Sequence, residues 1–163
     1  MLKYLFSLLI IFIFHVQMIG QTINNWIALP PQVSVTNGAT NGMWFTAPSD
    51  FVIKALMVPH ETTNPYDAQS IAVIKFTGTG PMAFLATNYS VLFLIQDTVT
   101  PDSIPVNISI QSGDHIGILG SRWNGLSGAG ESSNAGVSGF STSINGMATP
   151  LYKLQATSPL NNQ

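Results

Sequence analysis

The chain has 163 residues and no cysteine, and its charge comes from 5 Lys and Arg against 7 Asp and Glu. Charged residues make up 7% of the chain and hydrophobic residues 45%, whereas soluble domains usually carry roughly 25% charged residues. This apolar content excludes an intrinsically disordered chain, because disordered chains are polar and highly charged. The net charge of −2 provides no electrostatic footprint for nucleic acid or for an anionic membrane surface.

Residues 1–20 have the pattern of a secretory signal peptide. Lys3 supplies the positive start, residues 5–16 form an apolar run, and Gly20 is a small residue suited to the cleavage position. The run is shorter than the span of about 20 residues that crosses a bilayer. We therefore expect a secreted protein, extracellular or at the cell surface, whose mature chain begins at Gln21. Without cysteine it has no disulfides, no catalytic thiol and no thiolate zinc site.

The mature chain reads as a succession of short strands rich in Val, Ile, Phe and Thr, separated by Gly, Pro, Asn and Asp. The predicted strands are residues 32–36, 43–47, 51–58, 70–76, 91–96, 104–110, 115–119, 137–142 and 147–154. No segment longer than ten residues has an apolar period of 3.6, so almost no helix is expected. The fold class predicted is all-β: a single antiparallel β-sandwich, jelly-roll-like, of about nine short strands.

We place the β-sandwich domain at residues 38–154, after an N-terminal arm and first strand at 21–37 and before a polar tail at 155–163. Residues 104–110 alternate between apolar and polar, and Pro105 indicates either an edge strand or the first residues of a strand, because proline cannot donate to the ladder. Residues 91–95 are apolar on both faces, which predicts a central strand with its outer face covered. Residues 111–114 form a tight turn in which Gly113 takes a positive φ.

Two long polar loops carry the candidate ligand-binding residues, because long connections are often functional. Residues 60–69 contain His60 and Tyr66, and residues 120–136 contain Arg122, Trp123 and Asn124. Trp123 is suited to stack against a sugar ring while its neighbours supply hydrogen bonds. Alternatively, Trp123 folds back and covers one end of the sandwich.

Two other tryptophans have positions that suggest a role. Trp44 and Phe45 are consecutive in a strand, so one faces the core and the other faces the outer surface or an interface. Trp26 lies before the first predicted strand, where it either latches the N-terminal arm or docks onto a neighbouring subunit.

Catalytic and metal motifs are lacking. The mature chain has only His60 and His115, no Gly-x-Ser-x-Gly elbow, and no second histidine at zincin spacing after His60. Asp97 and Asp102 offer oxygens to calcium, but capping of their own turn explains them better. We therefore predict a protein that is not an enzyme and that has no cofactor or metal.

Uncharged hydrogen-bonding side chains replace the missing charge: Asn, Ser, Thr and Gln make up 48 of the 143 residues from Gln21 onwards. A surface of low net charge repels its own copies weakly and promotes association. The expected partners are therefore neutral: a glycan, or copies of the protein itself.

Three segments carry a resemblance to a known group of proteins: residues 42–48 (GMWFTAP), 71–76 (IAVIKF) and 104–120 (IPVNISIQSGDHIGILG). They resemble the β-sandwich modules of secreted and cell-surface proteins in Bacteroidota, over about residues 38–150. The resemblance implies an exported module without catalytic residues.

The function expected is a non-catalytic extracellular binding or adhesion module that faces carbohydrate. The alternative is a self-assembling subunit of an extracellular filament or surface layer, in which residues 21–31 add a strand to a neighbour. An enzyme using His60 or His115 with a carboxylate ranks third.

Overall fold

The computed structural model describes residues 26–30, 34–37, 40–59, 68–78, 80–81, 88–100, 103–123, 131–134 and 140–156. Within these ranges the chain forms ten β-strands and no helix, and every strand pair is antiparallel. The predicted all-β class and antiparallel sandwich are confirmed. The described part of the chain contains no helix of the length and apolarity needed to cross a membrane.

The strands follow the predicted positions closely. They are β1 (Ser34–Asn37), β2 (Thr40–Thr46), β3 (Phe51–Leu56), β4 (Ala68–Phe76), β5 (Tyr89–Val99), β6 (Ile104–Ile110), β7 (His115–Trp123), β8 (Glu131–Asn134), β9 (Phe140–Ile144) and β10 (Met147–Ala156). Each of the nine predicted strands overlaps an observed one, and β8 is the strand that was not predicted.

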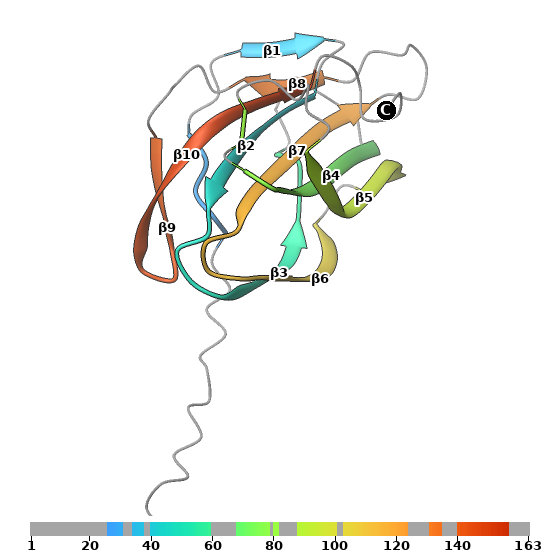
Figure 1. Ribbon diagram of the computed structural model, residues 1–163. Helices are drawn as coiled ribbons and strands as arrows, with labels where there is room; N and C mark the ends of the chain where they lie inside the picture. The colour runs from blue at the N-terminus through green and yellow to red at the C-terminus, as the bar shows by residue number, and fades with distance from the viewer. Residues whose placement is uncertain are drawn as a thin grey trace, which may run out of the picture.

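The strands form two layers of unequal size. The main sheet has eight strands in the order β1-β8-β7-β2-β10-β9, and β4 pairs with β7 and carries β5 on its other side. The small sheet consists of β3 and β6. Between β2 and β7 the chain crosses from one sheet to the other four times, as in a jelly-roll-like sandwich. Figure 1 shows β10, β2, β7 and β4 side by side, with β3 and β6 as a separate pair.

The space between the two sheets is filled by branched aliphatic and aromatic side chains. The alternation in residues 104–110 is confirmed, because Ile108 and Ile110 are buried while Pro105, Asn107 and Ser109 are exposed. The buried apolar side chains between the two sheets form what we call the inner cluster: Phe45, Ala47, Ile53, Leu56, Val58, Ile71, Val73, Ile108, Ile110, Ile116, Ile144 and Leu151.

The opposite face of the main sheet is buried as well. Its apolar side chains, called the outer cluster, are Trp44, Ala72, Ile74, Phe76, Leu119, Leu154 and Ala156. Burial on both faces accounts for the unbroken apolar run of β4, which does not alternate with polar residues. Trp44 and Phe45 face opposite sides as predicted, and both are buried, one in each cluster.

The turns at one end of the sandwich are tied together by hydrogen bonds. Gly113 has the predicted positive φ of 86°, and its N–H donates to the carbonyl of Ala47 at 2.8 Å. Asp50 Oδ1 accepts from the N–H of Ser112 at 2.7 Å. Asn145 Nδ2 donates to Ser49 Oγ at 3.0 Å, which brings the β9–β10 hairpin to the same end. These bonds fix how the β6–β7 turn and the β9–β10 hairpin meet the β2–β3 connection.

Two sequence predictions are wrong. The run 91–95 was expected in the centre of a sheet, but within the described residues β5 pairs with β4 alone and is an edge strand. The apolar side chains of residues 91–95 are compatible with a central strand and with an edge strand, so the sequence pattern did not decide between the two positions. The predicted loop 120–136 is shorter than expected, because β7 continues to Trp123 and β8 pairs with β1.

Other predictions concern chain ends. β10 includes Gln155 and Ala156, the first two residues of the predicted polar tail. The predicted signal peptide and its cleavage position lie outside the described residues, as do residues 157–163.

Replacement of Gly42 by alanine tests the close contact between β2 and β7. A Cβ at Gly42 would come within 1.9 Å of the carbonyl oxygen of Ile118, which is backbone and cannot swing away. We expect Gly42→Ala to lower the free energy of unfolding by about 3 kcal/mol or more, as measured by urea denaturation.

The matched control is Gly78→Ala, where an added Cβ meets no atom within 4 Å. It should change the stability by less than about 0.5 kcal/mol. Equal effects of the two substitutions would contradict the proposed close contact.

Candidate functional site

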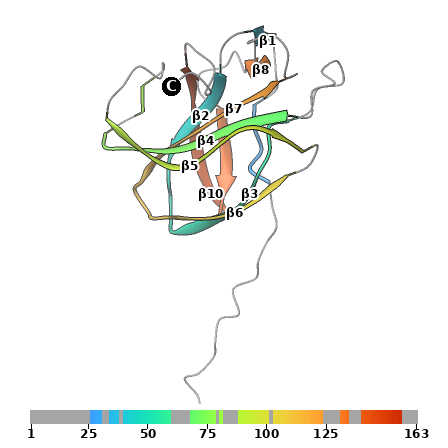
Figure 2. The same cartoon turned by 90° about the vertical axis from the view of Figure 1, so that its right-hand side faces the viewer.

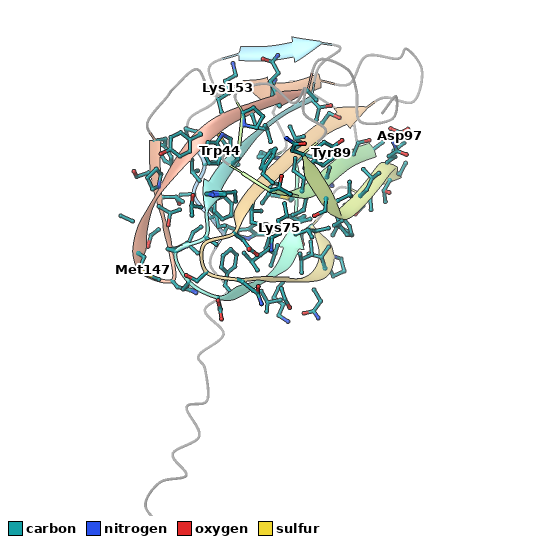
Figure 3. The ribbon with its side chains drawn as sticks, viewed as in Figure 1. Trp44, Lys75, Tyr89, Asp97, Met147 and Lys153 are labelled. Atoms are coloured by element: carbon teal, nitrogen blue, oxygen red, sulfur yellow. The ribbon has the colours of Figure 1, made fainter. Side chains whose placement is uncertain are left out.

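Three aromatic rings from three strands meet on the outer face of the main sheet. The register of β2 and β10 sets Trp44 opposite Tyr152, and their rings stack with centroids 4.4 Å apart and planes inclined by 21°. His115, from β7, contacts the edge of Trp44 at a centroid distance of 6.2 Å. We call Trp44, His115 and Tyr152 the aromatic patch. Figure 3 labels Trp44.

The two larger rings of the patch have different environments. Trp44 belongs to the outer cluster and is buried, whereas Tyr152 is 43% exposed. Gly80 packs onto Trp44 so closely that a Cβ there would lie 2.5 Å from the indole. Trp44 therefore supports one face of the tyrosine ring, and Tyr152 is the ring that the patch presents to solvent.

Hydrogen-bonding groups lie beside these rings. Thr46 Oγ1 and His115 Nδ1 share a hydrogen bond of 2.9 Å, in which the histidine tautomer sets the donor. The register explains the contact, because Thr46 and His115 are directly opposed on β2 and β7. Both side chains reach solvent, so the patch combines an aromatic surface with neutral polar groups.

An ion pair lies next to the patch in sequence. Lys75 Nζ and Asp114 Oδ1 are 2.7 Å apart, and Asp114 Oδ2 accepts from the N–H of Gln111 at 3.1 Å. The hydrogen bond from Lys75 lowers the pKa of Asp114 below its usual 3.8, although partial burial acts in the opposite direction. Both charges of the pair are thus engaged with each other.

Thr46 and His115 are a hydroxyl and an imidazole in contact, and a nucleophile also needs its base oriented by a third group. The carboxylate that precedes His115 in sequence, Asp114, is held by Lys75 and by the backbone of Gln111. Across the described ranges no three His, Asp or Glu side chains gather in a way that would hold a metal.

Arg122, a predicted ligand-binding residue, lies inside the domain rather than in a loop. Its side chain is 2% exposed, and its Nε and Nη2 donate to the carbonyl of Val58 at 3.0 and 2.7 Å. Gln69, its partner across β4 and β7, accepts from the N–H of Val58 at 2.8 Å. Val58 follows the end of β3, so these side chains satisfy a buried backbone that is outside any strand. This indicates a structural role.

The other predicted site residues are only partly described. Trp123 ends β7, and its side chain lies outside the described part, as do His60, Tyr66 and Asn124. Their predicted binding roles stay predictions. Of the five predicted site residues, Arg122 is thus the one whose side chain is described.

The possible calcium ligands are likewise only half described. Asp97 has a φ of 48°, and its carboxylate accepts a hydrogen bond from Ser70 Oγ at 3.2 Å, while Asp102 lies outside the described residues. The N–H of Asp97 donates back to Ser70 Oγ at 3.0 Å. Asp97 thus exchanges two hydrogen bonds with Ser70 of the neighbouring strand β4. Calcium binding by Asp97 and Asp102 stays a prediction.

Sequence reasoning missed Tyr152, Thr46 and His115 as members of one surface. The signal available was the consecutive Trp44 and Phe45, which requires one aromatic ring on the outer face. Nothing local in the sequence pairs residue 44 with residue 152, because that pairing depends on the long-range register of β2 and β10.

Substitution of Arg122 by methionine tests its structural role. Met fills a similar volume but leaves the carbonyl of Val58 without its two guanidinium donors. A buried acceptor without a partner costs about 1–3 kcal/mol, so we expect a loss of that size in the free energy of unfolding by urea denaturation. The control Lys153→Met, which removes a half-buried cation from β10, should cost less than about 0.5 kcal/mol.

The ion pair of Lys75 and Asp114 gives a pH-dependent prediction. Because the pKa of Asp114 is lowered in the folded state, the pair stabilises the protein above the unfolded pKa near 3.8. That contribution is lost as the pH falls through the lower, folded pKa. We expect Lys75→Met to cost up to about 1 kcal/mol at pH 7. The difference from wild type should shrink when urea denaturation is repeated from pH 5 down to pH 2, and a constant difference would contradict the assignment.

Comparisons with protein-family models, with curated proteins and with solved structures each found no match for this chain. The resemblance to exported β-sandwich modules of Bacteroidota stays a prediction from the sequence. The candidate site is therefore defined by its own geometry: Trp44 supporting an exposed Tyr152, with Thr46 and His115 beside them.

Proposed function

We propose that this protein is a non-catalytic extracellular module that binds carbohydrate through the aromatic patch. The observation that carries the proposal is the stacking of Tyr152, 43% exposed, on the buried ring of Trp44. A ring held in this way offers a flat apolar surface to a ligand without having to be ordered first, which reduces the entropic cost of binding.

The chemistry of the patch favours a neutral ring-shaped ligand. Binding sites for small molecules combine apolar and aromatic surface with a few polar groups that set orientation. A sugar has an apolar face of C–H groups for Tyr152 and hydroxyls for Thr46 and His115, whose side chains already share a hydrogen bond. The nearby charges of Lys75 and Asp114 are paired with each other, so a charged ligand would gain little from them.

Export supports an extracellular ligand. The pattern of residues 1–20 is that of a signal peptide, and the neutral polar composition of the chain suits contact with glycans. The resemblance to bacterial surface modules is in accord with this role. Secretion is part of the proposal.

The decisive experiment compares two tyrosine variants on a glycan array. The best glycan from the array is then titrated against Tyr152→Ala and Tyr152→Phe by affinity electrophoresis. Loss of the ring should weaken binding at least about tenfold, because a stacked aromatic contact at a binding site is worth more than about 1.4 kcal/mol. Tyr152→Phe keeps the ring and should retain most of the affinity.

A matched control and a competing variant complete the test. Val52→Ala removes an exposed apolar side chain from β3, on the small sheet, and should leave binding unchanged. Trp123→Ala tests the platform predicted from the sequence. If Trp123→Ala abolishes binding and Tyr152→Ala does not, the site lies at the end of β7 and the aromatic patch is not the binding surface.

A further inference from the structure

The edge of the main sheet formed by β5 has properties unlike those of the other edges. β5 has 11 residues, the longest of the described strands, and among those residues it pairs with β4 alone. Figure 2 shows β5 running next to β4, which separates it from β7. Within the described part of the chain, the row of backbone N–H and C=O groups of residues 91–95 on the side away from β4 faces no other strand, which makes it a possible site of strand addition.

Large apolar side chains are exposed along this edge. Val91 is 54% exposed and Leu94 is 47% exposed, and Leu92 and Val99 are exposed as well. The register places Val91 opposite Ile74 and Leu94 opposite Ala72. Both partners belong to the outer cluster, so Val91 and Leu94 extend the apolar surface of that face out to the margin of the sheet.

Other edges in the described structure carry features that discourage strand addition. β9 has only 5 residues, with exposed serines at 141 and 143. On the small sheet, β6 exposes Pro105, and Lys54 of β3 donates to Asn107 of β6 at 2.6 Å. Short length, proline and lysine are the usual means by which proteins prevent edges from pairing.

β5 is the longest of the described strands, and it lacks the other two protections as well. Residues 89–96 contain no charged residue and no proline. The first charge, Asp97, hydrogen-bonds through its carboxylate to Ser70 of its own sheet. Figure 3 labels Tyr89 and Asp97, which bound this neutral stretch. The register with β4 shifts on either side of residues 93–95, and such irregularities themselves discourage edge pairing. Because residues 93–95 are the regular part of the edge between the shifts, we expect pairing to centre there.

We propose that β5 is a self-association surface, where β5 of a second copy of this chain adds antiparallel about a twofold axis. An antiparallel pair uses the same surface on both subunits, as a twofold dimer requires. The neutral stretch then meets an identical neutral stretch, and no charge has to be desolvated. A chain with a net charge of −2 also repels its own copies weakly. Main-chain hydrogen bonds supply affinity, as in other cases of strand addition.

The first test is sedimentation velocity of the purified protein over a concentration series. Wild type should show reversible dimerisation. Leu94→Lys places a cation of each copy at the pairing edge, which should weaken dimerisation at least about tenfold. The control Val52→Lys puts the same charge on a site of β3 that is 40% exposed, against 47% for Leu94, and should dimerise like wild type.

The second test uses the absence of cysteine from the chain. Single-cysteine variants at Leu92, Leu94 and Val52 each carry one thiol, and a disulfide forms only where two Cα atoms approach within about 7 Å. Oxidation should produce covalent dimers from at least one of the two β5 variants, Leu92→Cys and Leu94→Cys, and none from Val52→Cys. This readout does not depend on a variant that weakens the fold.

Several outcomes would overturn the proposal. A wild-type protein that stays monomeric up to its solubility limit would do so, as would equal dimerisation of wild type and Leu94→Lys. Dimers that are lost on deletion of residues 21–25, but not in Leu94→Lys, would assign association to the N-terminal arm. Glycan binding that depends on Tyr152 should be unaffected by Leu94→Lys, so the two proposals fail separately.

Discussion

The structure depends on the burial of the main sheet on both of its faces. β4 and β7 lie between the inner and the outer clusters, so successive residues of one strand, such as Ile71 to Ile74, are all buried. This burial supplies the main driving force for folding, because each buried aliphatic side chain contributes about 1.5–3 kcal/mol. It also demands close contact between strands, which is why Gly42 lies against the backbone of Ile118. A chain without disulfides relies on this packing alone.

Buried polar side chains inside the sandwich form hydrogen bonds with backbone that packs in the core. Arg122 and Gln69 face one another on β7 and β4, and between them they satisfy the carbonyl and the N–H of Val58. The segment after β3 can therefore lie in the core without an unsatisfied backbone. Only 7% of the residues in this chain are charged. Because Arg122, one of the few cations, is buried, the surface carries still less charge.

Both proposed surfaces lie at the margin of the outer cluster. On β2 and β10, Trp44 is buried and Tyr152, which stacks on it, is 43% exposed. On β4, Ala72 and Ile74 are buried, whereas their partners on β5, Leu94 and Val91, are exposed. Because few residues of the chain are charged, we propose neutral partners for both of these apolar surfaces. We propose a sugar ring as the partner of the first surface and another copy of β5 as the partner of the second, because binding of either would desolvate no charge.

The sequence by itself determined the all-β class, the position of nine strands, the inward side chains of residues 104–110 and the positive φ of Gly113, because these follow from local periodicity and turn chemistry. Only the tertiary structure decided that residues 91–95 lie at an edge, that Arg122 is buried, and that Trp44 stacks on Tyr152. Each of these depends on which strands pair and in what register. That choice is made by contacts between residues far apart in the chain, and an apolar run looks the same in sequence whether or not another strand covers it.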